Sequence, residues 1–161
     1  MIRNLSLAAL MLAPVVASAA SQLPSAPYLP LELATKAAQT ALKTCAAQGH
    51  NVSVAVVARD GSTKVLLKAD NAGPHTTGSA QGKAFTSAAM GRDTAGLAEF
   101  IAGKPANNGL RDMDPRMVIQ AGGLPIKFDG ALVAGIGVGG APSGDIDANC
   151  AAAGIKDIGA Q

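Results

Sequence analysis

GGLPIKFDGALVAGIGVGG, residues 122–140, is the stretch of sequence that decides the fold. Its two apolar runs, residues 124–128 and 131–138, have the length and the Val, Ile and Leu content of β-strands. Asp129 and Gly130 separate the runs and are typical of a tight hairpin turn. The glycines of the second run lower its strand propensity, but they let a ligand or another part of the backbone approach closely. We therefore predict a β-hairpin at this point of the chain.

Three further strands are expected outside this hairpin. Residues 117–121 directly precede it and form a short apolar run. Residues 52–58 and 63–68 are two more apolar runs, and the turn sequence RDGS, residues 59–62, joins them into a second hairpin. Five strands in a hairpin and a meander, flanked by helices, predict the α+β class, with an antiparallel sheet and helices on its faces.

Four helices are predicted around these strands. The first begins directly after Pro30, because alanines recur there at helical spacing. Two more are expected over residues 79–90 and 94–102. Ser143 favours the cap of a last helix, which we expect to end just before Gly154.

Two cysteines lie on the first and last of these helices. Cys45 is on the inner face of the first helix and Cys150 is on the last. If both helices cover the same face of the sheet, the two side chains can meet, and an exported chain would oxidise them to a disulfide. Two free, buried thiols are the alternative. A metal site is less favoured, because no other Cys or His lies at ligand spacing.

The first residues have the layout of a secretory signal peptide. Arg3 precedes an apolar run, and small residues follow it up to an expected cleavage after Ala19. The run has about a dozen residues, fewer than the roughly 20 that a membrane helix needs. We therefore predict a signal peptide at residues 1–19, an extended segment at 20–30 and one domain at 31–161, in the periplasm or secreted. A buried N-terminal helix is the alternative.

Charge and composition argue against a nucleic-acid partner. The chain has 13 basic and 11 acidic side chains, so its net charge is close to zero. Aromatic residues make up 2% of the chain and tryptophan is absent. Neither a basic patch for phosphates nor a set of rings for base stacking is evident.

The two histidines differ in their surroundings. His50 follows a predicted helix end, where a surface position explains it. His75 lies in a loop directly before a helix, where an imidazole can project toward a bound group, so it is the preferred ligand and metal-binding candidate. Lys83, on that helix, can pair with an anionic ligand, and a solvated lysine is the alternative. The chain has neither a Gly-x-Ser-x-Gly elbow nor Cys-x-x-Cys-His, so no catalytic residue is assigned and enzyme activity stays undecided.

Five segments resemble the GlcG/HbpS-like proteins, also described as haem-binding or haem-degrading domain proteins. The segments run in the same order through most of the chain. They are VSVAVVARDG (residues 52–61), GPHT (73–76), KAFTSA (83–88), GGLPI (122–126) and DGALVAGIGVGG (129–140).

The resemblance implies a profilin-like α/β/α sandwich with a five-stranded antiparallel sheet, and it implies homo-oligomers. Some members of this family bind haem non-covalently, and at least one is a redox-responsive partner of a sensor kinase. His75 and Thr76 match a motif of the family, which strengthens His75 as a ligand candidate.

We therefore expect an exported protein that binds haem, or a similar small ligand, non-covalently and has a redox- or haem-sensing role. The expected ligand contacts are His75, Thr76, Lys83, Gly137 and Gly139, with His75 on the iron. One alternative is an accessory to an enzyme that acts on a small carboxylate or aldehyde, with Lys83 and glycine amides as the anion site. The other is a structural partner of a membrane sensor.

Overall fold

The computed structural model describes residues 25–161, so the predicted signal peptide lies outside it. These residues form an α+β fold around a four-stranded sheet with the order β2-β1-β4-β3. The strands are β1 (Ser53–Ala58), β2 (Thr63–Lys68), β3 (Gly123–Phe128) and β4 (Ala131–Gly139). All three neighbouring pairs are antiparallel. The two predicted hairpins are therefore confirmed, and β1 and β4 pair at the centre of the sheet.

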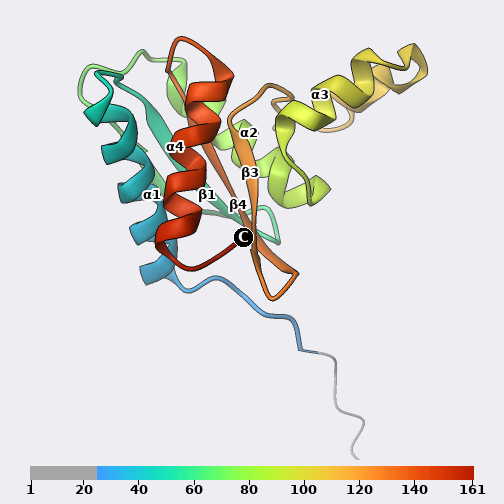
Figure 1. Cartoon of the computed structure of the whole chain (residues 1–161). Helices are drawn as coiled ribbons and strands as arrows, with labels where there is room; N and C mark the ends of the chain where they lie inside the picture. Colours follow the sequence, from blue (N-terminus) through green and yellow to red (C-terminus); the bar gives the residue numbers. More distant parts are fainter. Residues whose placement is uncertain (1–24) are drawn as a thin grey trace, which may run out of the picture.

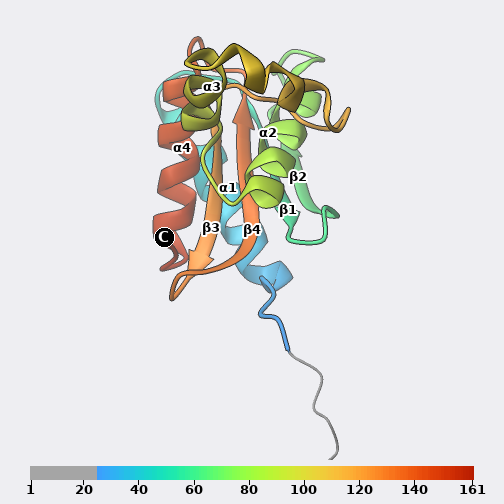
Figure 2. The same cartoon turned by 90° about the vertical axis from the view of Figure 1, so that its right-hand side faces the viewer.

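Helices cover both faces of this sheet (Figure 1). α1 (Leu31–Ala47) and α4 (Gly144–Asp157) pack on one face, and α2 (Thr76–Met90) and α3 (Thr94–Ala102) lie on the other. Figure 2 shows α2 and α3 in front of the sheet and α1 behind it. A 3₁₀ helix, η1 (Pro105–Asp112), follows α3.

The side chains of β1 alternate between the two faces, as the two-residue period of a strand requires. Val54 and Val56 belong to the apolar core under α1 and α4. Ala55 and Val57 belong to the second core, under α2 and α3. A strand buried on both sides reads as a continuous apolar run, which is why β1 is visible in the sequence.

The prediction of five strands is wrong within the described residues, because residues 117–121 do not join the sheet. Their backbone bonds to the helices instead. The Val118 N–H donates to Thr86 Oγ1 at 2.9 Å, and Thr94 Oγ1 donates to the Gln120 carbonyl at 2.6 Å. An added Cβ at Gly82 would overlap Val118, so the missing side chain lets this segment cross α2 closely. The profilin-like class stays a prediction.

β4 presents a row of glycines to α2. Gly135, Gly137 and Gly139 alternate with residues that enter the opposite core, so all three point toward the same helix. An added Cβ at Gly135 or Gly137 would overlap the α2 backbone around Ala84. The helix therefore rests directly on the strand, with no side chain between them. The predicted close approach of another backbone is confirmed.

The contact between α1 and α4 depends on a glycine as well. Gly154 was predicted to end α4, but the helix continues to Asp157, so that prediction is wrong. An added Cβ at Gly154 would overlap the Ala37 carbonyl of α1, so close packing of the two helices selects the glycine. The positive φ of Gly159, 72°, follows the true helix end.

The predicted disulfide joins α1 to α4. Cys45 and Cys150 are bonded and fully buried, with their Cα atoms 5.6 Å apart. The alternative of two free thiols is wrong. The bridge closes a sequence separation of 105 residues, which corresponds to about 4–5 kcal/mol of stabilisation from unfolded-chain entropy.

A Gly137→Ala substitution tests the packing of α2 on β4. The new methyl group would meet helix backbone that cannot rotate away, so we expect a loss of about 3 kcal/mol in the free energy of unfolding, measured by urea denaturation. Gly78→Ala is the matched control on α2, because a Cβ there meets nothing within 4 Å. It should be neutral or stabilise by up to about 1 kcal/mol. Equal stability of the Gly137→Ala variant and the unmodified protein would contradict the packing described.

Candidate functional site

The candidate site is a cavity of about 280 Å³ between the start of α2, the loop after β4 and the start of α4. We name it the His75 cavity. It brings together His75 and Lys83, two of the predicted ligand contacts. The other lining residues are Ser79, Gln120, Asp147 and residues 140–144.

His75 directly precedes α2, and its side chain is exposed. The imidazole lies over Gly73, where an added Cβ would stand 2.8 Å from Cε1 and 3.0 Å from Nδ1. Nε2 is farther away, at 3.8 Å from the same point. No hydrogen bond to the imidazole is found among residues 25–161. The ring is therefore accessible, and its nitrogens are free to bind a ligand.

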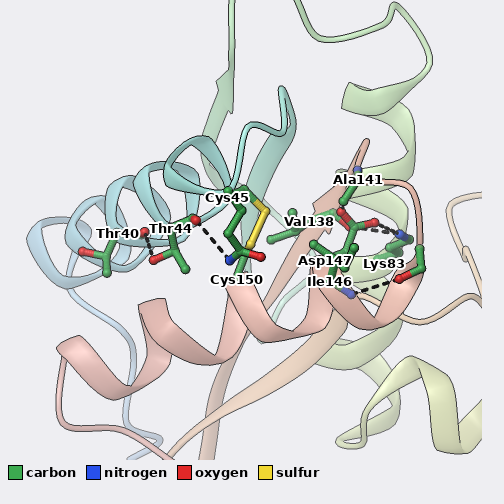
Figure 3. The surroundings of a disulfide bond; sticks show 11 residues. Thr40, Thr44, Cys45, Lys83, Val138, Ala141, Ile146, Asp147 and Cys150 are labelled. Atoms are coloured by element: carbon green, nitrogen blue, oxygen red, sulfur yellow. Dashed lines mark hydrogen bonds and ion pairs between the residues drawn. A yellow bond between two sulfur atoms is a disulfide. The ribbon is translucent and has the colours of Figure 1, made fainter.

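Lys83 lies at the bottom of the cavity and is paired with Asp147. Lys83 Nζ is 2.9 Å from Asp147 Oδ2, and the two side chains are only 2% and 3% exposed. Nζ also donates to the Val138 carbonyl at 3.0 Å, and Asp147 Oδ1 accepts from the Ala141 N–H at 3.1 Å. Figure 3 shows how these groups converge at the start of α4. The alternative of a solvated lysine is therefore wrong, and the charge of Lys83 is already neutralised within the protein.

Gly122 covers this ion pair from the loop before β3. Its φ is +119°, and an added Cβ would lie 2.8 Å from Asp147 Cβ and 2.9 Å from Lys83 Nζ. Both the backbone conformation and the lack of space therefore demand glycine. The Gly122 carbonyl accepts a hydrogen bond from the Val138 N–H at 2.9 Å, which joins the loop to β4.

Three other predicted ligand contacts do not line the His75 cavity. Thr76 is buried, and its hydroxyl bonds to Ser53 Oγ at 2.7 Å and to the Gly73 carbonyl at 2.8 Å. Gly137 and Gly139 lie against α2. The structure gives these residues a packing role, because the space that the glycines leave is filled by the helix.

Asp147 is the site residue that the sequence reasoning missed. An acidic residue in the first turn of a helix is explained by the helix dipole, so nothing in the sequence linked it to Lys83. Asp145, in the same turn, has the same signature. The position of Lys83 on the inner side of a predicted helix is the sequence signal that could have prompted a search for a carboxylate partner, because a buried lysine is almost always paired.

The His75 cavity offers one free imidazole above a neutralised ion pair. Within residues 25–161, no group of three or more His, Cys, Asp or Glu side chains could hold a metal ion. Among the described residues, His75 is the one lining side chain of this cavity with an unpaired ligand nitrogen, because Asp147 is held by Lys83. Among the same residues, no helix is long and apolar enough to cross a membrane.

Comparisons with known proteins identify relatives over most of the chain. The profile of the family described as "Haem degrading protein HbpS-like" matches residues 29–156. The crystal structure of HbpS is 45% identical and covers 88% of this chain and 98% of its own, with a TM-score of 0.80. A double mutant of HbpS from Streptomyces reticuli is also 45% identical, covers 90% and 97%, and has a TM-score of 0.80.

A more distant structure has the same fold. The PduOC:heme complex is 23% identical and covers 84% of this chain and 98% of its own, with a TM-score of 0.77. No curated protein matches the chain in sequence.

Removing one partner of the ion pair should destabilise the protein strongly. Lys83→Met leaves the Asp147 carboxylate buried without its cation, and we expect a loss of about 3–5 kcal/mol in the free energy of unfolding, measured by urea denaturation. The double variant Lys83→Met/Asp147→Leu removes both charges and should recover most of this loss. A single variant within about 1 kcal/mol of the unmodified protein would show that the pair is not buried as described.

Proposed function

The chain belongs to the family of HbpS-like haem-degrading proteins, and on that premise we propose that it binds haem non-covalently through His75. The observation that carries this proposal is the exposed imidazole of His75 beside a cavity, with no hydrogen bond to another described residue. Imidazole is a common axial ligand of haem iron. The haem in the PduOC complex, which has the same fold, supports the choice of ligand.

His75 is the better of the two histidines for this role. His50 follows the end of α1, is half-buried and does not line the His75 cavity. His75 lies on a cavity and is held by a well-fixed loop, because Thr76 bonds the loop to β1 through Ser53 Oγ at 2.7 Å. A ligand on a fixed loop loses less conformational entropy when it binds iron.

The cavity is too small to enclose a haem. Its volume of about 280 Å³ is just below the roughly 300–1,000 Å³ of sites that enclose a drug-sized ligand. A haem bound through His75 would therefore extend beyond the cavity, and Ala141 and Pro142 are among the residues that could hold it. The homo-oligomer that the family resemblance implies is part of the proposal.

The protein's own contribution is to hold and orient the haem. Bound haem supplies iron-centred redox chemistry. His75 would supply a nitrogen ligand to the iron, and the buried Lys83–Asp147 pair at the bottom of the cavity would support the site without adding net charge. The pairing of Lys83 with Asp147 argues against Lys83 as the anion site of the alternative enzyme-accessory function.

Export is part of the proposal. A signal-like segment at residues 1–19 and a disulfide between Cys45 and Cys150 both suit an oxidising compartment outside the cytoplasm. The sensing role and the membrane-sensor partner rest on the family resemblance alone.

A haemin titration of the mature protein, followed by its Soret band, tests the proposal. We expect a shifted and saturable band, and we expect His75→Ala to weaken binding by about tenfold or more, because the iron loses its protein ligand. His50→Ala is the control and should bind haemin as the unmodified protein does. An unchanged titration of the His75→Ala variant would remove His75 as the ligand.

A further inference from the structure

A second cavity lies on the neighbouring face of α2. Its volume is about 290 Å³, and it is bounded by the β1–β2 turn, α2 and the segment that includes Pro115 and Arg116. We name it the Arg116 cavity. None of its lining residues belongs to the His75 cavity. A ligand could therefore occupy either cavity without displacing one from the other.

The Arg116 cavity has an apolar floor and a polar rim. Val57, Phe85 and Val118 form the floor. Thr63 and Gln81 lie at the rim, where Gln81 Nε2 is 3.4 Å from Thr63 Oγ1. A hydrogen bond of this length is weak, so both groups remain available to a ligand. An apolar surface with a few convergent polar groups is the usual composition of a small-molecule site.

Gly78 keeps one side of this cavity open. It lies on α2 and lines the cavity, and an added Cβ would meet nothing within 4 Å. Packing does not demand this glycine, in contrast to Gly82 on the same helix, where a Cβ would overlap Val118. Gly78 is exposed in the first turn of α2, so a larger side chain can be placed at this edge of the cavity without displacing a neighbour.

The guanidinium of Arg116 is fixed in position at this cavity. Its Nε and Nη2 donate to Asp114 at 3.0 and 2.7 Å, and its Cζ lies 4.0 Å from the centroid of the Phe85 ring. Hydrogen bonds from Arg116 lower the pKa of Asp114 to about 2, so the pair stays ionised at neutral pH. These contacts leave Nη1 of the guanidinium without a hydrogen-bond partner among the described residues. Nη1 would lie 3.6 Å from a Cβ at Gly61, which places it beside the β1–β2 turn.

A second arginine adds positive charge next to Arg116. An adjoining cavity of about 220 Å³ shares Gly61, Phe85 and Arg116 with the first and is also lined by Arg59, Asp60 and Ala89. Arg59 Nη1 donates to the Ala88 carbonyl at 2.9 Å, and no ion pair of Arg59 is found among residues 25–161.

The two acidic side chains near Arg59 and Arg116, Asp60 and Asp114, have hydrogen-bond partners within the protein. Asp60 accepts hydrogen bonds from the N–H and hydroxyl of Ser62, at 2.9 and 2.6 Å, and Asp114 is held by Arg116. The two aspartates balance the charges of Arg59 and Arg116, so what the cavity offers a ligand is the hydrogen-bonding edge of Arg116 at Nη1 rather than an excess of positive charge.

From these contacts we propose that the Arg116 cavity binds a small organic carboxylate with a compact apolar body. The carboxylate accepts hydrogen bonds from Arg116 Nη1 and from the polar rim, because a guanidinium matches the geometry of a carboxylate. The apolar body lies on Phe85 and Val57. The site is independent of haem binding and of His75.

Benzoate is the probe, because it combines a carboxylate with a flat apolar ring. The mature protein is titrated with benzoate by isothermal calorimetry, beside acetate, which lacks the ring, and benzyl alcohol, which lacks the charge. We expect saturable binding of benzoate that is about tenfold or more tighter than that of either partial probe. No saturable binding of benzoate, or equal binding of benzyl alcohol, would overturn the proposal.

Two variants locate the site. Gly78→Leu fills the cavity while leaving Arg116 in place, and it should abolish benzoate binding without lowering the melting temperature. Gly109→Leu makes the same change on η1, where a Cβ also meets nothing within 4 Å, and should bind benzoate normally. Arg116→Lys keeps the charge but loses the fork, and should weaken binding by about tenfold.

Undiminished benzoate binding by the Gly78→Leu variant would overturn the location. A haemin titration of the same variant distinguishes this failure from failure of the proposed function, because the two cavities share no lining residue.

Discussion

The direct contact between the glycine row of β4 and the alanines of α2 sets the position of the functional residues on and next to α2. Gly135, Gly137 and Gly139 leave no side chain between strand and helix. The backbone of α2 therefore rests directly on β4, which fixes the distance of the helix from the sheet and its position along the strand. α2 then places His75 and Lys83 at one cavity and Phe85 at the other. A chain poor in aromatic residues thus gains a well-defined structure from close backbone contacts rather than from large side chains.

Two further constraints fix α4 against the rest of the protein. Asp147 pairs with Lys83 of α2, and Cys150, one turn later, is bonded to Cys45 of α1. Figure 3 shows both attachments on the same helix. Because burial of two charges is costly unless they meet with good geometry, the ion pair tolerates little displacement of α2 from α4. The His75 cavity lies between these two helices, so its shape depends on the pair.

Much of the fold could be predicted from the sequence, and the exceptions have physical causes. The hairpins and the disulfide followed from apolar periodicity, turn residues and two cysteines on helices. Residues 117–121 have the apolar pattern of a strand, but the Val118 N–H bonds to α2 and the Gln120 carbonyl accepts from Thr94 of α3, which sequence patterns do not reveal. Gly154 resembled a helix end, yet it is a point of contact between helices.

The candidate site was harder to predict than the fold. His75 was visible from its loop, whereas the Lys83–Asp147 pair joins residues 64 positions apart. The glycines at 137 and 139 allowed either a ligand or a backbone nearby, and only the folded chain decides that the backbone of α2 is there. Arg116 and Gly78 have no motif at all, because their cavity is formed by three segments that meet only in the fold.

The central claim is that the imidazole of His75 ligates haem iron, and magnetic resonance can observe that bond directly. The chain has two histidines, so in a His50→Gln variant labelled with ¹⁵N-histidine the only labelled side chain is that of His75. Electron–nuclear double resonance of its ferric haem complex should then show ¹⁵N coupled to the iron. A haem complex without this ¹⁵N coupling would contradict the account.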